Sequence, residues 1–151
     1  MVWSQLGAVA GFAVVVLLCC SPLLALSRLR DLFRWPTEWL AVNYLLVGGV
    51  LVGVQSLSYL GIMLLVAGTG TVTGGDAAGI VAGVLAANLC LPGGVALAAL
   101  RLLPERGYWT PDGDGLSGRV ALGIGVVWYA AVTSVGFVLV GLTLLFANLP
   151  T

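Results

Sequence analysis

The chain has 151 residues, of which 60% are hydrophobic and 8% are charged, and its formal net charge at pH 7 is zero. Because an ordinary soluble domain carries about 25% charged residues, this composition excludes a soluble globular fold. The sequence contains no histidine and no lysine. It therefore excludes histidine-ligated haem, a retinal Schiff base and Ser–His or Cys–His nucleophile pairs, so we expect neither a cofactor nor catalytic activity.

Four long stretches of the sequence carry no charge. They run from Met1 to Ser27, between Glu38 and Asp76, from Ala77 to Leu100 and from Val120 to Thr151. Roughly 20 apolar residues in a helix are enough to cross the hydrocarbon of a bilayer. The sequence therefore predicts one all-α transmembrane domain over residues 1–151, an integral four-helix bundle with spans at about 3–26, 38–67, 77–103 and 119–149.

Local signals refine the ends of these spans. Pro22 lies near the end of the first span, and a charged loop follows from Ser27 to Pro36. Thr37 and Glu38 resemble a helix start, with an N-capping hydroxyl before an acidic first turn, and Asp76 is placed to cap the third span. Pro92, followed by two glycines, predicts a kink or local unwinding in that span.

The arginines predict the orientation of the bundle. Three lie between the first two spans, and three lie between or beside the last two: Arg28, Arg30 and Arg34, then Arg101, Arg106 and Arg119. Cytoplasmic loops carry the excess of basic residues, so both of these loops are expected in the cytoplasm and both termini outside. The protein is thus predicted to be a multi-pass protein of the cell membrane.

The two halves of the chain also resemble each other. Arg28 and Trp35 in the first arginine-containing loop correspond to Arg101 and Trp109 in the second, at nearly equal separations. One interpretation is a parallel two-helix repeat, as in some transporters. The other is chance, because apolar helices resemble one another by composition alone.

Three spans contain two glycines four residues apart. The pairs are Gly7 and Gly11, Gly49 and Gly53, and Gly79 and Gly83. Such a pair forms a shallow groove on one helix face, where a second backbone can approach closely, and this packing is a main attraction between helices in lipid. The three pairs predict a tightly packed bundle, with one glycine face available for oligomerisation.

Polar side chains within the spans are the remaining candidates for a site. An unpaired amide in hydrocarbon is costly, so Asn43, Gln55 and Asn88 should face one another or a polar cavity. Gln55 and Asn88 lie near the middle of the second and third spans and are expected to pair. They could serve as structural hydrogen bonds or as contacts to a substrate or ion. No ionisable group is expected at mid-membrane, which argues against a proton-coupled carrier.

The three cysteines are open to two interpretations. The neighbours Cys19 and Cys20 could form a redox pair or bind a metal, with Cys90 as a further thiol. They do not form a C-x-x-C motif, however, so we interpret them as small apolar residues of helices and expect no metal site.

Two non-enzymatic functions fit these features. The first is an accessory or structural membrane subunit that packs through its glycine-rich helix faces. The second is an oligomeric small channel or carrier with a polar path near Gln55 and Asn88. In both, the partners are the lipid bilayer and either copies of the chain or other membrane subunits, and neither calls for nucleic acid.

Overall fold

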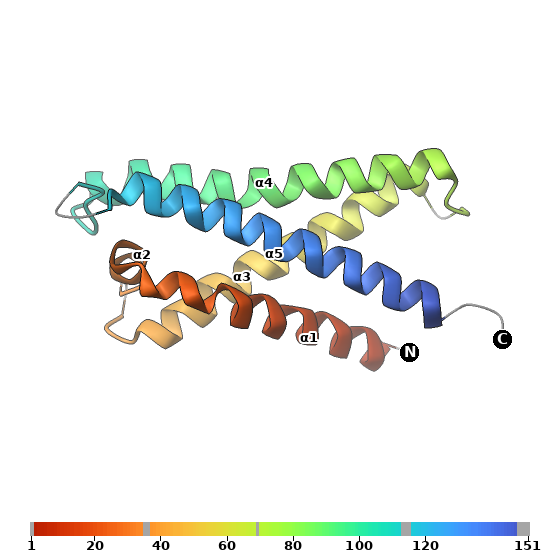
Figure 1. Ribbon diagram of the computed structural model, residues 1–151, viewed down its shortest axis with the longest axis horizontal. Coiled ribbons are helices and arrows are strands. Elements are labelled where there is room, and N and C mark those ends of the chain that lie inside the picture. The colour runs from red at the N-terminus through yellow and green to blue at the C-terminus, as the bar shows by residue number, and fades with distance from the viewer. Residues whose placement is uncertain (1, 35–36, 69, 113–115, 148–151) are drawn as a thin grey trace.

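Four long helices make up most of the chain, and successive ones run in opposite directions (Figure 1). They are α1 (Val2–Cys20), α3 (Leu40–Ala67), α4 (Gly74–Glu105) and α5 (Gly118–Ala147). A short 3-10 helix, η1 (Ser21–Ala25), and a short α-helix, α2 (Ser27–Leu32), connect α1 to α3. This computed structural model describes residues 2–34, 37–68, 70–112 and 116–147. The all-α prediction is confirmed for these residues.

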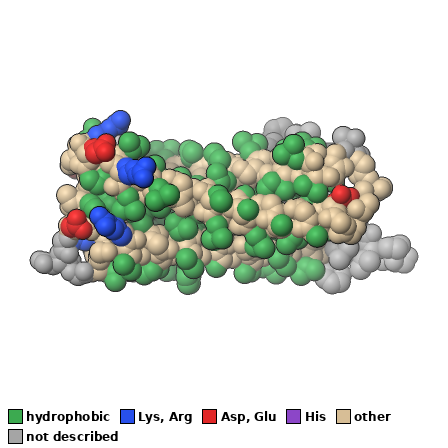
Figure 2. Space-filling model, turned by 90° about the horizontal axis from the view of Figure 1, so that it is seen from above, with side chains coloured by type: hydrophobic (Ala, Val, Ile, Leu, Met, Phe, Trp, Pro, Cys, Tyr) green, Lys and Arg blue, Asp and Glu red, His purple; other side chains and the backbone are tan. Residues whose placement is uncertain are grey.

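Three of the helices, α3, α4 and α5, are long and apolar enough to cross a membrane. Among the described residues the first helical region contributes a shorter apolar segment, Ala10–Ala25, so the first predicted span, at about 3–26, stays a prediction. Large hydrophobic side chains cover the outside of the bundle (Figure 2), and Leu57 and Leu65 are 69% and 88% exposed. Such a surface is stable in lipid, and the protein is a candidate multi-pass membrane protein.

Charged side chains lie at the ends of the bundle. The arginines and most acidic residues gather at the end that contains α2 and the α4–α5 connection, whereas the acidic residue Asp76 lies at the opposite end (Figures 1 and 2). The first turn of α1 and the last turn of α5 are also at the end opposite the arginines (Figure 1). Which end faces the cytoplasm stays a prediction. The parallel repeat does too, and Trp35 and Pro36 lie outside the described residues.

The connection between α1 and α3 is more ordered than the sequence indicates. The α-helical ladder of α1 ends at Cys20, where η1 begins with Pro22 in its first turn. The helix α2 then replaces part of the expected charged loop, with Leu29 buried and Arg30 exposed. At six residues this amphipathic helix is too short to show a clear apolar periodicity in the sequence.

The helix α3 does not start as predicted. Its N-cap is Trp39, which makes no side-chain capping hydrogen bond, and the Thr37 hydroxyl instead donates to Oδ1 of Asn43 at 2.8 Å. Nδ2 of Asn43 donates to the carbonyl oxygens of Phe33 at 2.9 Å and Thr37 at 2.7 Å. The prediction of an N-cap at Thr37 was therefore wrong. The buried Asn43 amide fastens the segment before α3 instead.

The helix α4 begins with a capping box and continues without interruption. Thr73 is the N-cap and exchanges hydrogen bonds with Asp76, so Asp76 contributes from the first turn rather than as the cap itself. The helix is continuous through Pro92, so of the two predicted alternatives the local unwinding was wrong and the kink stays a prediction. Proline removes one N–H donor, whereas unwinding in hydrocarbon would leave several backbone groups without partners.

The helices do not stay equally close along their length. In Figure 1, α3 crosses the bundle diagonally, lying beside α4 near the α3–α4 turn and beside α1 toward the arginine end. At the arginine end a buried cluster of Leu29, Ala96, Trp109, Ala121 and Leu122 joins α2, α4 and α5. Nε1 of Trp109 donates to the carbonyl oxygen of Arg28 at 3.3 Å, which ties the α4–α5 connection to α2.

The orientation of the bundle in the membrane can be measured with single-cysteine variants. We expect Thr71→Cys, in the α3–α4 turn, to react with a membrane-impermeant maleimide in intact cells, and Thr110→Cys, in the α4–α5 connection, to react only after permeabilisation. Both threonines are exposed, and Cys19, Cys20 and Cys90 would first be replaced by alanine. The reverse labelling pattern would contradict the predicted orientation.

Candidate functional site

Two of the most buried amides, Gln55 and Asn88, meet between α3, α4 and α5. Nε2 of Gln55 donates to Oδ1 of Asn88 at 2.8 Å, and the Tyr59 hydroxyl donates to the same oxygen. Nδ2 of Asn88 donates to Oγ of Ser134 at 2.8 Å. We call Gln55, Tyr59, Asn88 and Ser134 the central polar cluster. Through it, one amide on α4 joins the three candidate spans.

Helical spacing brings these residues together. Gln55 and Tyr59 are one turn apart and therefore share a face of α3. On α4, buried residues recur every four positions, and Asn88 is the only amide in that line: Ile80, Val84, Asn88, Pro92 and Ala96. The sequence predicts that Gln55 and Asn88 pair, but no pattern in it connects them with Tyr59.

The hydrogen bonds of this region are almost complete. Gln55 is fully buried and Asn88 is 1% exposed, so water does not reach either amide. The buried Thr133 hydroxyl, next to the cluster, donates back to its own helix, to the carbonyl oxygen of Tyr129 at 2.8 Å. Oε1 of Gln55 is the exception in the cluster, because it has no hydrogen-bond partner among the described residues. An unpaired acceptor of this kind is costly in hydrocarbon.

The third amide of interest, Asn43, lies apart from this cluster. Its side chain is 1% exposed and binds only the segment before α3, at the arginine end. The arginines are at the same end, where the side chains of Arg34 and Asp31 form an exposed ion pair at 3.6 Å. Exposed ion pairs of this kind contribute little stability.

The three glycine pairs have different surroundings. A Cβ at Gly83 would lie 2.8 Å from Cγ2 of Ile62, and one at Gly79 would lie 3.1 Å from Cγ1 of Val66, so this pair faces α3 closely. Among the described atoms, a Cβ would meet nothing within 4 Å at the other four glycines: Gly7, Gly11, Gly49 and Gly53. Two of the three glycine faces are therefore open.

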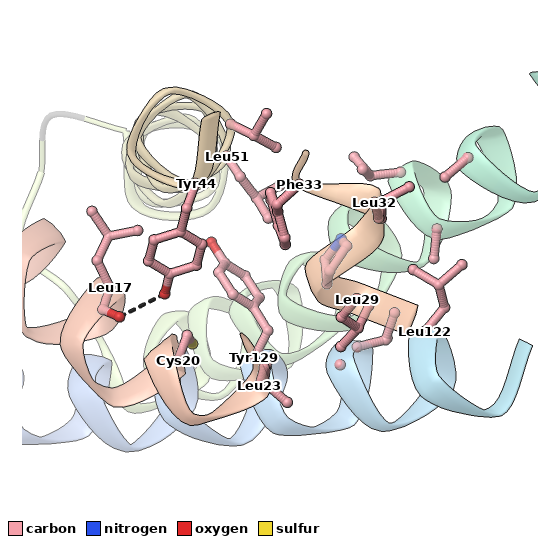
Figure 3. A pocket seen from close by; sticks show the side chains of 18 of the residues that line it. Leu17, Cys20, Leu23, Leu29, Leu32, Phe33, Tyr44, Leu51, Leu122 and Tyr129 are labelled. Atoms are coloured by element: carbon pink, nitrogen blue, oxygen red, sulfur yellow. Dashed lines mark hydrogen bonds between the residues drawn. The ribbon is translucent and has the colours of Figure 1, made fainter. Parts of the chain in front are cut away.

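A second feature, not visible in the sequence, is an apolar pocket of about 300 Å³ at the arginine end (Figure 3). It lies between α1, η1, α2, α3, α4 and α5, where the diagonal course of α3 leaves room beside α4. Tyr44 and Tyr129 supply the hydroxyl groups of its wall. Tyr44 donates to the carbonyl oxygen of Leu17 at 2.6 Å, whereas the Tyr129 hydroxyl has no partner among the described residues.

One signal in the sequence could have pointed to this pocket. Tyrosines of membrane proteins gather at the interfaces, where the hydroxyl meets water. Tyr129 instead lies well inside the last uncharged stretch, roughly 15 Å along a helix from Arg119. The other residues that line the pocket with Tyr129 come from five further elements as well as α5, so the pocket itself could not be derived from the sequence.

The three cysteines lie on two helices, with Cys19 and Cys20 at the end of α1 and Cys90 on α4. Cys19 and Cys90 are exposed, and Cys20 is buried in the wall of the pocket. All three are free thiols. Within the described ranges, no group of three or more Cys, Asp or Glu side chains is placed to hold a metal ion.

Comparison with known proteins identifies a family but no activity. A family model described as a domain of unknown function, DUF8162, matches residues 1–150. The chain belongs to this family. No curated protein and no solved structure matches the chain. For this DUF8162 protein, function must therefore be argued from the central polar cluster, the glycine faces and the pocket.

Asn88 should be the most sensitive polar position in the bundle. Asn88→Leu would leave Gln55, Tyr59 and Ser134 without their shared partner, and we expect it to lower the free energy of unfolding by roughly 2–3 kcal/mol. Ser58→Ala is the control, because that hydroxyl binds only its own helix, at the carbonyl oxygen of Val54.

The two variants would be compared by SDS-induced unfolding in mixed micelles, followed by circular dichroism. For Ser58→Ala we expect a change within about 0.5 kcal/mol. If Asn88→Leu unfolds at the same SDS fraction as Ser58→Ala, the central polar cluster does not hold the three helices together.

Proposed function

We propose that this protein is a non-catalytic accessory or structural subunit of the cell membrane, and that α3 binds a transmembrane helix of another subunit or of a second copy. The observation that supports this proposal is the open glycine pair Gly49 and Gly53. Both residues are exposed, and a Cβ at either would meet no described atom within 4 Å.

The surroundings of this pair resemble a helix-docking groove. Exposed apolar side chains flank the two glycines at helical spacing, forming one stripe that we call the α3 glycine face: Val42, Leu46, Gly49, Gly53 and Leu60. A glycine inside a helix costs about 1 kcal/mol relative to alanine. Within this chain that cost is not offset by close packing at Gly49 or Gly53, whereas a second helix in the groove would offset it.

Two further features favour a structural role over an enzymatic one. The segments between the long helices are short, and they leave no room for a separate soluble domain. The central polar cluster is buried and uses most of its hydrogen-bonding groups within the bundle. Its side chains are thus better suited to fixing helix positions than to meeting a substrate.

One observation favours the second candidate, an oligomeric channel or carrier. Oε1 of Gln55 is an acceptor without a partner in the part of the chain that the structure describes, and it lies on a helix that crosses the middle of the bundle. In a carrier, this oxygen would contact a substrate or ion. Gln55→Leu would then abolish flux in vesicles without changing the subunits that copurify, whereas a structural Gln55 would affect stability alone.

Replacing either open glycine with leucine should dissociate the proposed complex. We expect Gly49→Leu and Gly53→Leu each to reduce the copurifying partner or second copy by about tenfold or more, because the new side chain fills the groove. The matched control is Gly123→Leu on α5, another exposed glycine whose Cβ would meet no described atom. The measurement is native mass spectrometry of protein extracted from its own membrane in mild detergent.

The pattern among the variants decides the proposal. A stoichiometric complex that survives in Gly123→Leu but is lost in both α3 variants supports docking at the α3 glycine face. A monomeric wild-type protein, or a complex that persists equally in all three variants, would contradict it.

A further inference from the structure

We propose that the apolar pocket at the arginine end binds a neutral, lipid-soluble molecule that has a compact head with a hydrogen-bond acceptor, such as a carbonyl, and a hydrocarbon tail. The Tyr129 hydroxyl would donate to that acceptor. This inference does not depend on the docking of another helix to α3.

The size and lining of the pocket determine the chemistry of the ligand head. The pocket measures about 300 Å³, and an apolar cavity of about 150 Å³ is enough to hold benzene. Apolar side chains dominate its wall, among them Leu29, Leu51 and Leu122. Water does not fill cavities of this kind, so an occupant would be a hydrocarbon or a neutral ring.

The Tyr129 hydroxyl supplies one polar contact. Tyr129 is 7% exposed, and its hydroxyl has no hydrogen-bond partner among the described residues. Figure 3 shows its ring extending from α5 toward α3, on the side where Tyr44 enters the pocket. Tyr44 already donates to Leu17, which leaves Tyr129 as the donor available to a ligand.

The depth of Tyr129 excludes a charged or strongly hydrated head. At a rise of about 1.5 Å per residue, Tyr129 lies roughly 15 Å along α5 from Arg119, which is about half the thickness of the hydrocarbon. A charged group at that depth is costly. The acceptor must therefore belong to a molecule that already dissolves in the bilayer.

The pocket has a side on which such a molecule can enter. A groove between α3 and α4 is lined by Leu46, Val47, Val50, Leu51, Val54 and Val95. Val47, Leu51 and Val95 also line the pocket, so the two spaces adjoin. On the aqueous side, Leu29 and Leu32 of α2 cover the pocket. A ligand would thus enter from the lipid, with its head in the pocket and its tail in the groove.

The proposal can be tested with a defined probe, 4-decyloxybenzophenone, whose single carbonyl also reacts with nearby C–H bonds under ultraviolet light. The full-length protein in lipid nanodiscs would be irradiated over a range of probe concentrations, digested and mapped by mass spectrometry. We expect saturable adducts on residues of the pocket wall. Non-saturable adducts spread over the exposed leucines and valines of α3 and α5 would overturn the proposal.

Matched variants separate the pocket from the general lipid-facing surface. Ala99 lines the pocket and Ala98 is exposed beside it, so Ala99→Phe should reduce labelling of the wall by about tenfold or more while Ala98→Phe leaves it unchanged. Val47→Trp provides a second block at an exposed position of the groove, where folding tolerates a larger side chain. Equal labelling in Val47→Trp and the wild type would contradict entry through the groove.

Tyr129→Phe tests the hydrogen bond itself. Removing one donor to a neutral acceptor should raise the probe concentration for half-maximal labelling about fivefold, with the sites of the adducts unchanged. A half-maximal concentration equal to that of the wild type would overturn the assignment of Tyr129 as the donor.

Discussion

The arrangement of the bundle depends on the pairing of polar groups that cannot reach water. Asn88 lies in the middle of α4. Its side-chain oxygen, Oδ1, accepts hydrogen bonds from α3, and its Nδ2 donates one to α5. In lipid, apolar side chains give little preference for one helix neighbour over another, because a lipid tail is as apolar as leucine. A shared amide does give such a preference, because its hydrogen bonds form only when each helix is rotated about its axis so that its polar side chain faces the amide. The close contacts of Gly79 and Gly83 with α3 require the same relative position of α3 and α4 as these hydrogen bonds.

The course of α3 follows from the position of this cluster. Close packing at Gly83 and the hydrogen bonds at Gln55 hold α3 beside α4 on one side of the centre. Toward the arginine end, the buried Asn43 fastens the start of α3 to the segment after α2. From the first attachment toward the second, α3 diverges from α4, and the apolar pocket lies where the two helices are apart. The pocket is thus a consequence of where polar side chains find partners, and α2 covers it with apolar residues.

Two glycine pairs of the chain have different surroundings and different roles. Gly79 and Gly83 allow helices of the same chain to approach each other, whereas Gly49 and Gly53 present the same local pattern to the exterior. The first pair serves the fold. The second pair makes no close contact with another helix among the described residues. The proposed subunit function therefore assigns the partner helix to this face of α3. Val47 and Leu51 of α3 line the proposed ligand pocket, whereas Leu46 belongs both to the α3 glycine face and to the groove proposed for the ligand tail.

The sequence by itself predicted the all-α class, four spans, of which three are long apolar helices in the structure, and the gathering of arginines at one end, because charge and hydropathy act locally along the chain. It also placed Gln55 and Asn88 near the centre of adjacent spans. Only the tertiary structure decided that Tyr59 and Ser134 join them, that Thr37 binds Asn43 instead of capping α3, and that α4 continues through Pro92. These outcomes, like the pocket around Tyr129, depend on which side chains of distant segments meet, and helical periodicity does not encode those meetings.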